Sequence, residues 1–138
     1  MALSFTTLAR NALLDSIETY AGTAAVVKVY QMTTGSAVPA ADTAVVPGTV
    51  LATITNPSDY FTAASGGSMT KTGTWSDTSA DAAGTCAFFR MYKADGTTNV
   101  LQGSIGTAGT CDMVVDNQVF AAGQTFTVTT FTLITANV

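Results

Sequence analysis

The N-terminal segment of the chain repeats its apolar positions with the period of an α-helix. The recurring residues, three to five positions apart, would form one stripe: Leu8, Ala12, Leu13, Ile17, Tyr20 and Ala21. Ser4 or Thr6 can cap the first turn with a side-chain oxygen, and Gly22 stands where a left-handed C-cap would follow the last turn. The pattern predicts an amphipathic helix over residues 5–21. Its apolar stripe would pack on its own domain or, as an arm, on a neighbouring subunit.

Beyond Gly22 the pattern becomes that of β-strands, with β-branched and aromatic residues between short turn sequences. Residues 33–48 contain two prolines and two glycines and predict a loop, with or without a short edge strand. The strands recur every ten to thirteen residues and are joined by turns such as Asp95-Gly96. The predicted strands cover residues 25–32, 49–55, 68–75, 85–93, 97–105, 110–116 and 124–136. This spacing predicts a mainly-β, antiparallel β-sandwich, jelly-roll or immunoglobulin-like, of about seven or eight strands.

In the last predicted strand, the apolar residues expected to face the core change from even-numbered to odd-numbered positions. Phe126 and Val128 share one parity, whereas Phe131 and Leu133 have the other. A bulge near residues 129–130 would produce this change, and so would a strand that is buried on both faces. The length of 138 residues suits one domain. We therefore expect an N-terminal helix within residues 1–22 and a β-sandwich over residues 23–138.

The composition favours a neutral rather than an ionic surface. Apolar residues make up 47% of the chain, charged residues only 10%, and 26 of the 138 residues are threonine. Soluble domains average about 25% charged residues. So few charges and so many apolar residues exclude intrinsic disorder. A surface of threonine, serine, alanine and glycine loses little free energy on desolvation, which suits a subunit of an assembly.

The charge balance restricts the partners. Five basic and nine acidic residues give a net charge of −4 and a pI near 4.2, and no basic stripe is present. The sequence therefore predicts no nucleic-acid partner. The N-terminus lacks the basic head and apolar run of a secretory signal, and no apolar run approaches the ~20 residues of a membrane span. We expect no membrane partner and synthesis in a cytoplasm.

The residues that usually carry catalysis are absent or isolated. There is no histidine, so a Ser-His-Asp or Cys-His pair cannot form. Lys28, Lys71 and Lys93 are the only lysines, and each lies in a strand pattern where we expect it to face solvent. A nucleophile activated by lysine is therefore not expected.

Two pairs of aspartates are the remaining catalytic candidates. Asp77 and Asp81 share one Ser/Ala-rich loop, and Asp112 and Asp116 flank a predicted strand. A glycosidase would need one carboxyl group with a raised pKa in a sugar-binding cleft, and calcium would need more oxygen ligands than this loop offers. We expect both pairs to be solvated turn or cap residues. The sequence predicts a protein that is not an enzyme and that holds no cofactor and no metal.

The glycine-rich stretch and the two cysteines are the remaining candidates for a functional site. Residues 103–109 (GSIGTAG) join strand to strand and lack the helix N-terminus that phosphate binding requires. Alternation places Cys111 with Met113 on the core face and places Cys86 on the face opposite Phe89. Free buried thiols are one possibility, and a disulfide between Cys86 and Cys111 that forms after release from the cell is the other.

The order of these segments resembles a family of small virion proteins of tailed phages and prophages. The segments, which cover nearly the whole chain, are LARNALLDSIETYAG, VVKVYQ, TVLATIT, SDYFTAASGGSMTKTGTWSDTSADAAGT and FFRMYKADGTTNVLQGSIGTAGTCDMVVDNQVFAAGQTFTVTTFTLITANV. The resemblance implies a structural protein, assembled in the host cytoplasm and located in the virion. It implies a capsid decoration (cement) protein on the outer capsid surface, or a tail-associated structural protein. The partners implied are the major capsid protein and further copies of this chain, and no catalytic residues are implied.

A carbohydrate-binding adhesion module is the competing interpretation. In such a module Trp75, Tyr60, Phe61 and Tyr92 would form a platform on which sugar rings stack. Aromatic residues at alternating strand positions more often belong to the core. A virion-associated hydrolase that uses Asp77 or Asp81 is a third, weaker possibility.

Overall fold

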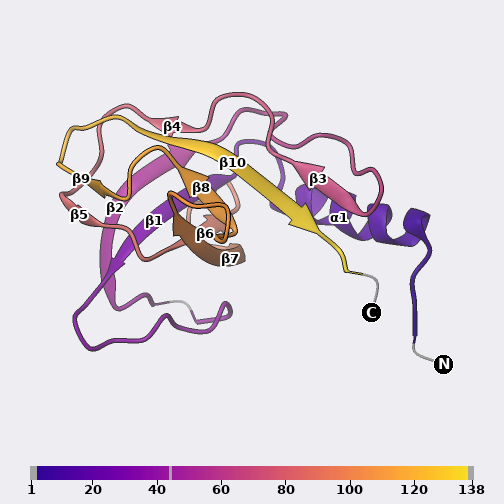
Figure 1. Cartoon of the computed structure of the whole chain (residues 1–138), viewed down its shortest axis with the longest axis horizontal. Coiled ribbons are helices and arrows are strands. Elements are labelled where there is room, and N and C mark those ends of the chain that lie inside the picture. The colour runs from indigo at the N-terminus through magenta and orange to yellow at the C-terminus, as the bar shows by residue number, and fades with distance from the viewer. Residues whose placement is uncertain (1–2, 44, 137–138) are drawn as a thin grey trace.

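The computed structural model describes residues 3–43 and 45–136 and begins with one helix, α1, Thr7–Ala21 (Figure 1). The hydroxyl of Thr6 accepts a hydrogen bond from the backbone N–H of Ala9 at 3.2 Å, which satisfies one donor of the first turn. The helix ends at Gly22, whose φ of 75° suits glycine. The predicted N-cap, C-cap and approximate extent of this helix are confirmed.

The rest of the described chain is mainly β, as predicted. Its strands are β1 (Val26–Met32), β2 (Gly48–Thr55), β3 (Ser68–Thr70), β4 (Ser76–Asp77), β5 (Gly84–Thr85), β6 (Phe88–Tyr92), β7 (Asn99–Gly106), β8 (Met113–Val115), β9 (Val119–Phe120) and β10 (Phe126–Ile134). The strand predicted over residues 68–75 is shortened to β3, and the one predicted over residues 85–93 is interrupted between β5 and β6. No strand is assigned within the described residues of the 33–47 loop.

The main sheet has eight strands in the order β2-β1-β6-β7-β8-β10-β3, with β4 also paired to β10. A second, small sheet pairs β5 with β9. Among the described strands all pairings are antiparallel except that of β7 with β8. The chain therefore crosses over between β7 and β8 through residues 107–112, whereas the sequence pattern predicted hairpins throughout its second half.

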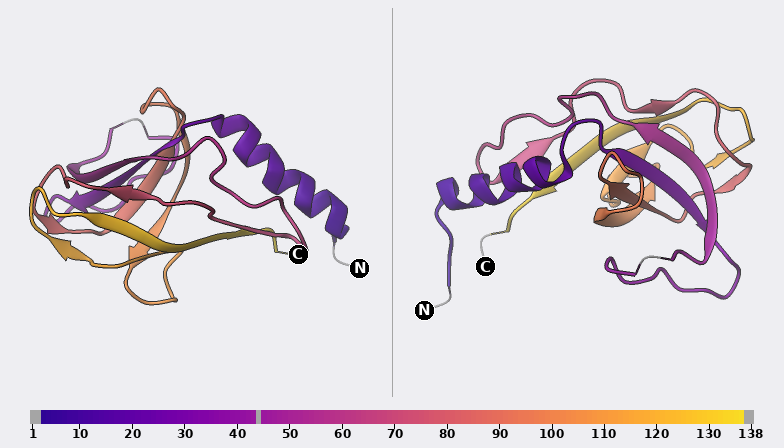
Figure 2. Two further views of the ribbon diagram at one scale, coloured as in Figure 1. Left: turned by 90° about the horizontal axis from the view of Figure 1, so that it is seen from above. Right: turned by 180° about the vertical axis from the view of Figure 1, so that it is seen from behind.

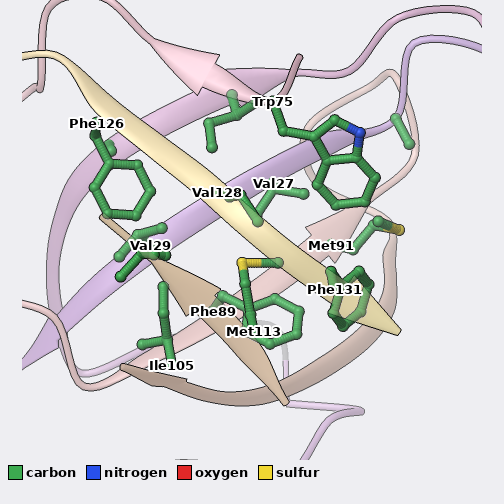
Figure 3. Close-up of a cluster of buried hydrophobic side chains, with 14 of the residues drawn as sticks. Val27, Val29, Trp75, Phe89, Met91, Ile105, Met113, Phe126, Val128 and Phe131 are labelled. Atoms are coloured by element: carbon green, nitrogen blue, oxygen red, sulfur yellow. The ribbon is translucent and has the colours of Figure 1, made fainter. Parts of the chain in front are cut away.

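The main sheet curls back on itself, so that its two halves face each other as in a sandwich (Figure 2). Figure 3 shows β10 crossing over β1, with Val27 and Val29 of β1 facing Phe126 and Val128 of β10. All four side chains are buried in the main core. Burial of this kind contributes about 25 cal/mol per Å² of apolar surface and is the main source of stability.

A β-bulge in β10 confirms the parity change seen in the sequence. The register with β8 shifts between Val128 and Thr130, because Val128 pairs with Val115 and Thr130 with Val114. The extra residue lets Phe131 return to the core, where its ring packs edge-on against that of Phe89, with 5.3 Å between the ring centroids.

Strand β6 is buried on both of its faces. Phe89 and Met91 belong to the main core, whereas Phe88 and Tyr92 form an outer cluster with Val26 and Tyr30. The ring of Phe88 stacks on that of Tyr30, with 5.1 Å between the ring centroids. The hydroxyl oxygens of Tyr30 and Tyr92 are hydrogen-bonded at 2.7 Å.

The loop over residues 33–47 covers this outer cluster and is fastened by Arg90. The guanidinium, 0% exposed, donates to the carbonyls of Thr43 (2.6 Å) and Ala40 (2.8 Å) and to Oε1 of Gln102 (2.7 Å). The side-chain amide of Gln102 in turn donates from Nε2 to the carbonyl of Pro39 at 2.7 Å. We call these contacts the arginine clamp. Among the residues that the structure describes, Arg90 is bonded to neutral oxygens and to no carboxylate.

Both outer edges of the main sheet are covered. At β2, the N–H of Thr53 donates to Oδ2 of Asp77 at 2.9 Å, and the carbonyl of Leu51 accepts from the N–H of Asp81 at 2.8 Å. At β3, residues 60–62 lie alongside and exchange backbone hydrogen bonds with residues 70 and 72. Covered edges cannot pair with foreign strands.

Candidate interaction surface

Helix α1 packs on the sheet through a face different from the predicted one. Its buried residues are Leu14 and Ala21, with Ile17 packed partly against the core. Most of the predicted apolar stripe, including Leu8 and Leu13, instead faces solvent. The helix does pack on its own domain, but in a rotated orientation.

Polar side chains explain this orientation. Asn11 accepts a hydrogen bond from the N–H of Gly67 at 2.8 Å, and Asp15 accepts one from the N–H of Ala64 at 3.1 Å. Glu18, one turn further along, receives hydrogen bonds from the backbone of Phe61 and Tyr60. This spacing of four and three places the three side chains on one helix face. They satisfy N–H groups along residues 60–67 that would otherwise be left unpaired.

The solvent-facing side of α1 is therefore partly apolar. Leu8 is 80% exposed, Tyr20 55% and Leu13 47%. The preceding residues 3–6 add Leu3, which is 74% exposed, and Figure 1 shows this segment leading away from the body. We call this set the outer apolar face. These side chains share the exposed side of the helix with Ser16 and Thr19, and their number and size favour an interaction site there.

A second feature is an opening in the main sheet between β7 and β10. Strand β8 separates these two strands, but it begins only at Met113, while both neighbours extend further. The opening in line with β8 holds a groove of about 320 Å³, lined mainly by Phe89, Leu101, Gln102, Phe131 and Leu133. A second hollow of about 310 Å³ lies beside the same stretch of β10, lined by residues such as Val114, Thr130 and Thr132. We call the two hollows together the sheet gap.

The aspartate pairs serve as structural hydrogen-bond acceptors. Asp77 and Asp81 are brought together, since Thr53 donates its N–H to Asp77 and its hydroxyl to Asp81 (2.8 Å). Asp112 and Asp116 are held apart by β8. Asp112 accepts from the N–H and the hydroxyl of Ser104, both at 2.7 Å, and these hydrogen bonds lower its pKa.

The three lysines are half-buried and not fully solvent-facing, which corrects the expectation from sequence. Lys28 donates to the carbonyl of Gly96 at 2.8 Å and lies 5.1 Å from the ring of Tyr92. Lys71 lies over Trp75, and burial lowers its pKa. The ammonium of Lys93 lies 3.7 Å from the ring of Tyr20, at the helix C-terminal end. All three therefore combine apolar cover with a cation–π contact.

The proposed stacking platform for sugars is absent from the surface. Trp75, Tyr60, Phe61 and Tyr92 are all buried. The first three pack on one another in the main core, and the Tyr60 hydroxyl donates to the carbonyl of Gly22 at 3.0 Å. The platform hypothesis is wrong for these residues, because the rings of Tyr60, Phe61 and Trp75 fill the main core and that of Tyr92 lies in the outer cluster.

Both cysteines are free thiols. Cys86 belongs to the same core cluster as Phe89, which corrects its predicted placement on the opposite face. The strand breaks between β5 and β6, at residues 86–87, so simple alternation does not carry through. Burial raises the pKa of Cys86 to about 11, with a smaller effect from Cys111 nearby. Cys111 is half-buried, and the disulfide between the two stays a prediction.

Within residues 3–43 and 45–136, no group of three or more potential ligand side chains is placed to hold a metal ion. The helix that the structure describes is too short and too polar to cross a bilayer. Comparisons with protein-family models, curated proteins and solved structures find no match.

Sequence reasoning missed three features of these surfaces. The helix acceptors Asn11, Asp15 and Glu18 carry a detectable signal, because their spacing is itself helical. Arg90 also carries one, as a lone cation inside the apolar strand sequence FFRMY. The sheet gap has no signal in the sequence, because it depends on where β8 begins relative to β7 and β10.

Proposed function

We propose that this protein is a structural component of a tailed-phage particle, a capsid decoration protein that binds the major capsid lattice and further copies of itself. The outer apolar face is the observation that carries the proposal. It presents large apolar side chains on a helix that is already anchored by its other face, so binding would not require the helix to refold. The resemblance of the sequence segments to small virion proteins supports the same interpretation.

The neutral surface supports an assembly role on physical grounds. No ion pair is formed among residues 3–43 and 45–136, and most exposed positions are threonine, serine, alanine or glycine. Such surfaces exchange water for protein without the cost of desolvating charges. The acidic excess suits the outside of a capsid better than a surface that faces DNA.

The location is tested on particles of a phage that encodes this chain. Cryo-electron microscopy should show its density in a regular array on the head. Density on the tail would instead support a tail-associated structural protein. Absence of the chain from purified particles, measured by mass spectrometry and by density, would overturn the proposal.

The binding face is tested by adding purified protein back to particles that lack it. Leu8→Gln and Leu13→Gln should each weaken decoration at least tenfold, because each removes an apolar side chain from the outer apolar face. Thr49→Gln, at an exposed position of β2 away from the helix, is the control and should decorate normally. Equal binding by all three variants would show that the helix is not the contact. Deletion of the whole helix is a poorer test, because it also removes Leu14 and Ala21 from the core.

A further inference from the structure

We infer that helix α1 exchanges between two copies of this chain, so that each copy docks its helix on the body of the other. The linker between α1 and β1, residues 22–25, is the hinge of this exchange. Such an exchange is a specific form of the self-association in the proposed function and rests on it. Strain in the linker, the limited packing of the helix and the location of its docking partners support it.

The linker turns in a backbone conformation that alanine does not favour. Ala24 has a φ of 58° and is the one non-glycine residue of the described chain with a positive φ. Gly22, two residues earlier, has a φ of 75°. An alanine in the left-handed region is disfavoured by about fivefold or more, because its Cβ approaches a carbonyl oxygen too closely. A linker that straightens releases this strain, and it carries α1 away from its own body.

The hinge is short and is fastened at its two ends. The carbonyl of Gly22 accepts a hydrogen bond from the hydroxyl of Tyr60 at 3.0 Å. On the strand side, the carbonyl of Ala25 accepts one from the N–H of Asn56 at 3.0 Å. Rotation at residues 23–24 moves the helix side of the linker and leaves the strand side in place. Three extended residues span about 10 Å, so the exchange changes a few backbone angles and does not refold the sheet.

Helix α1 is lightly packed on the body. Of its fifteen residues, Leu14 and Ala21 are the buried ones, with Ile17 packed partly against the core. Figure 2 shows α1 at one end of the molecule, outside the curled sheet. An element with so little buried surface can detach without unfolding the whole domain. Detachment is the step that exchange requires.

The groups that dock α1 belong to the body and not to the linker. Asn11 accepts from the N–H of Gly67 at 2.8 Å, and Arg10 donates to the carbonyl of Thr135 at 3.2 Å. The docking site fits this helix in particular, because the N–H donors along residues 60–67 match acceptors spaced four and three residues apart. A second copy supplies the identical helix and meets the same groups.

Concentration decides between the two arrangements. Exchange preserves the docking contacts, so the strain released in two linkers favours the pair, and the loss of independent motion opposes it. We expect monomers in dilute solution and exchanged pairs where copies are crowded, as on a particle lattice. The pair is closed, since each copy donates one helix and accepts one. Docking does not use the outer apolar face, so both arrangements present it.

The hinge is tested on the isolated full-length protein by sedimentation velocity. The wild type should form dimers as its concentration approaches about 1 mM, a weak pairing in which no contact is gained. Ala24→Gly relieves the strain in the monomer and should lower the association constant about thirtyfold, because about fivefold applies to each of the two linkers. Thr23→Gly is the matched control, since its φ is not positive, and should keep the constant within about threefold.

Ala24→Pro acts in the opposite direction. The proline ring fixes φ near about −65° and blocks the turn that the monomer needs. This variant should be dimeric at about 10 μM, a hundredfold below the concentration expected for the wild type, with a normal circular dichroism spectrum. If it does not fold, the Ala24→Gly comparison and the cross-link described next decide.

A disulfide between residues 15 and 64 shows on which copy the helix docks. Oδ1 of Asp15 lies 3.1 Å from the backbone nitrogen of Ala64, so cysteines at these positions are within reach of each other. Asp15→Cys and Ala64→Cys are combined with Cys111→Ser, which removes the less buried natural thiol. Oxidised glutathione should close the disulfide within one chain in the dilute monomer and between chains in the dimer, as a non-reducing denaturing gel distinguishes.

Four results would overturn the inference. They are a wild type that stays monomeric at about 1 mM, an Ala24→Gly association constant equal to that of Thr23→Gly, a folded Ala24→Pro variant that is monomeric, and dimers whose disulfide between residues 15 and 64 lies within one chain. The last result would mean that copies pair through another surface. None of these measurements uses phage particles. Leu8→Gln and Leu13→Gln should exchange like the wild type, so the particle-binding proposal can fail or hold separately.

Discussion

Replacing Arg90 by methionine tests whether a buried cation without an anionic partner stabilises this fold. The substitution keeps most of the apolar stem and removes the arginine clamp. Three hydrogen bonds from a charged donor are lost, each contributing about 1.5–3 kcal/mol before desolvation is considered. Against this, the protein no longer buries an unpaired charge, which costs several kcal/mol. The carbonyls of Ala40 and Thr43 lie on exposed residues and can bond to water instead.

The balance predicts a net loss of about 2–4 kcal/mol in the free energy of unfolding, or roughly 6–15 °C in Tm for a domain of this size. Urea denaturation measures the first quantity. Lys28→Met is the matched control, because Lys28 pairs with Arg90 across the sheet and makes one comparable hydrogen bond, to Gly96. We expect that control to lose less than about 1 kcal/mol.

The loop provides an independent readout. Residues 33–47 contain alanine and valine but no lysine or arginine, so elastase, and not trypsin, reports on their exposure. Arg90→Met should be cut in this loop much faster than the wild type or Lys28→Met. If Arg90→Met is as stable as the control, or if its loop is equally resistant, the clamp does not stabilise the fold and the reasoning is refuted.

Three further predictions concern titration, reactivity and backbone strain. Burial raises the pKa of Glu18, with smaller contributions from nearby carboxylates, so its stabilising contribution is full below about pH 4.5 and declines as pH rises through the folded pKa. Glu18→Gln should therefore be more stable than the wild type at pH 7, by less than about 1 kcal/mol, and this advantage should vanish below pH 4 in urea titrations. Iodoacetamide should label Cys111 well before Cys86, as peptide mass spectrometry would show. If neither cysteine is labelled and the mass of the intact protein is lower by two hydrogens, the two form the disulfide. Gly67→Ala should lower the free energy of unfolding by about 1–2 kcal/mol, and by more than Gly66→Ala does. Both glycines have positive φ, but only at Gly67 would an added Cβ lie 2.5 Å from the guanidinium of Arg10. Equal losses of the two variants in denaturation curves would contradict this.

The sequence predicts most reliably the elements whose side chains alternate between core and solvent. Strands β1, β2, β7 and β10 lie within two residues of their predicted bounds at nearly every end, and the bulge in β10 is visible as a change of parity. Strand β9 contains two residues, which are too few to produce a periodic pattern in the sequence. The parallel pairing of β7 with β8 is equally hidden, because it depends on the path of the crossover.

The candidate surface could be predicted only in part. The helix position follows from its caps and spacing, but its rotation is set by backbone N–H groups of residues 60–67, which a comparison of apolar residues cannot detect. Asn11 and Asp15 therefore face the backbone of residues 64–67, and Leu8 and Leu13 face solvent. For the aromatic residues the error is the opposite one, because rings that the sequence allowed to lie on the surface and bind sugars are buried.

The covered edges of the sheet have a consequence for a protein stored at high concentration. Carboxylates and loop amides occupy the hydrogen-bonding groups of β2 at Leu51 and Thr53, and residues 60–62 shield β3. Neither rim can template the stacking of one molecule on the next, so crowded copies should resist forming amyloid-like fibrils.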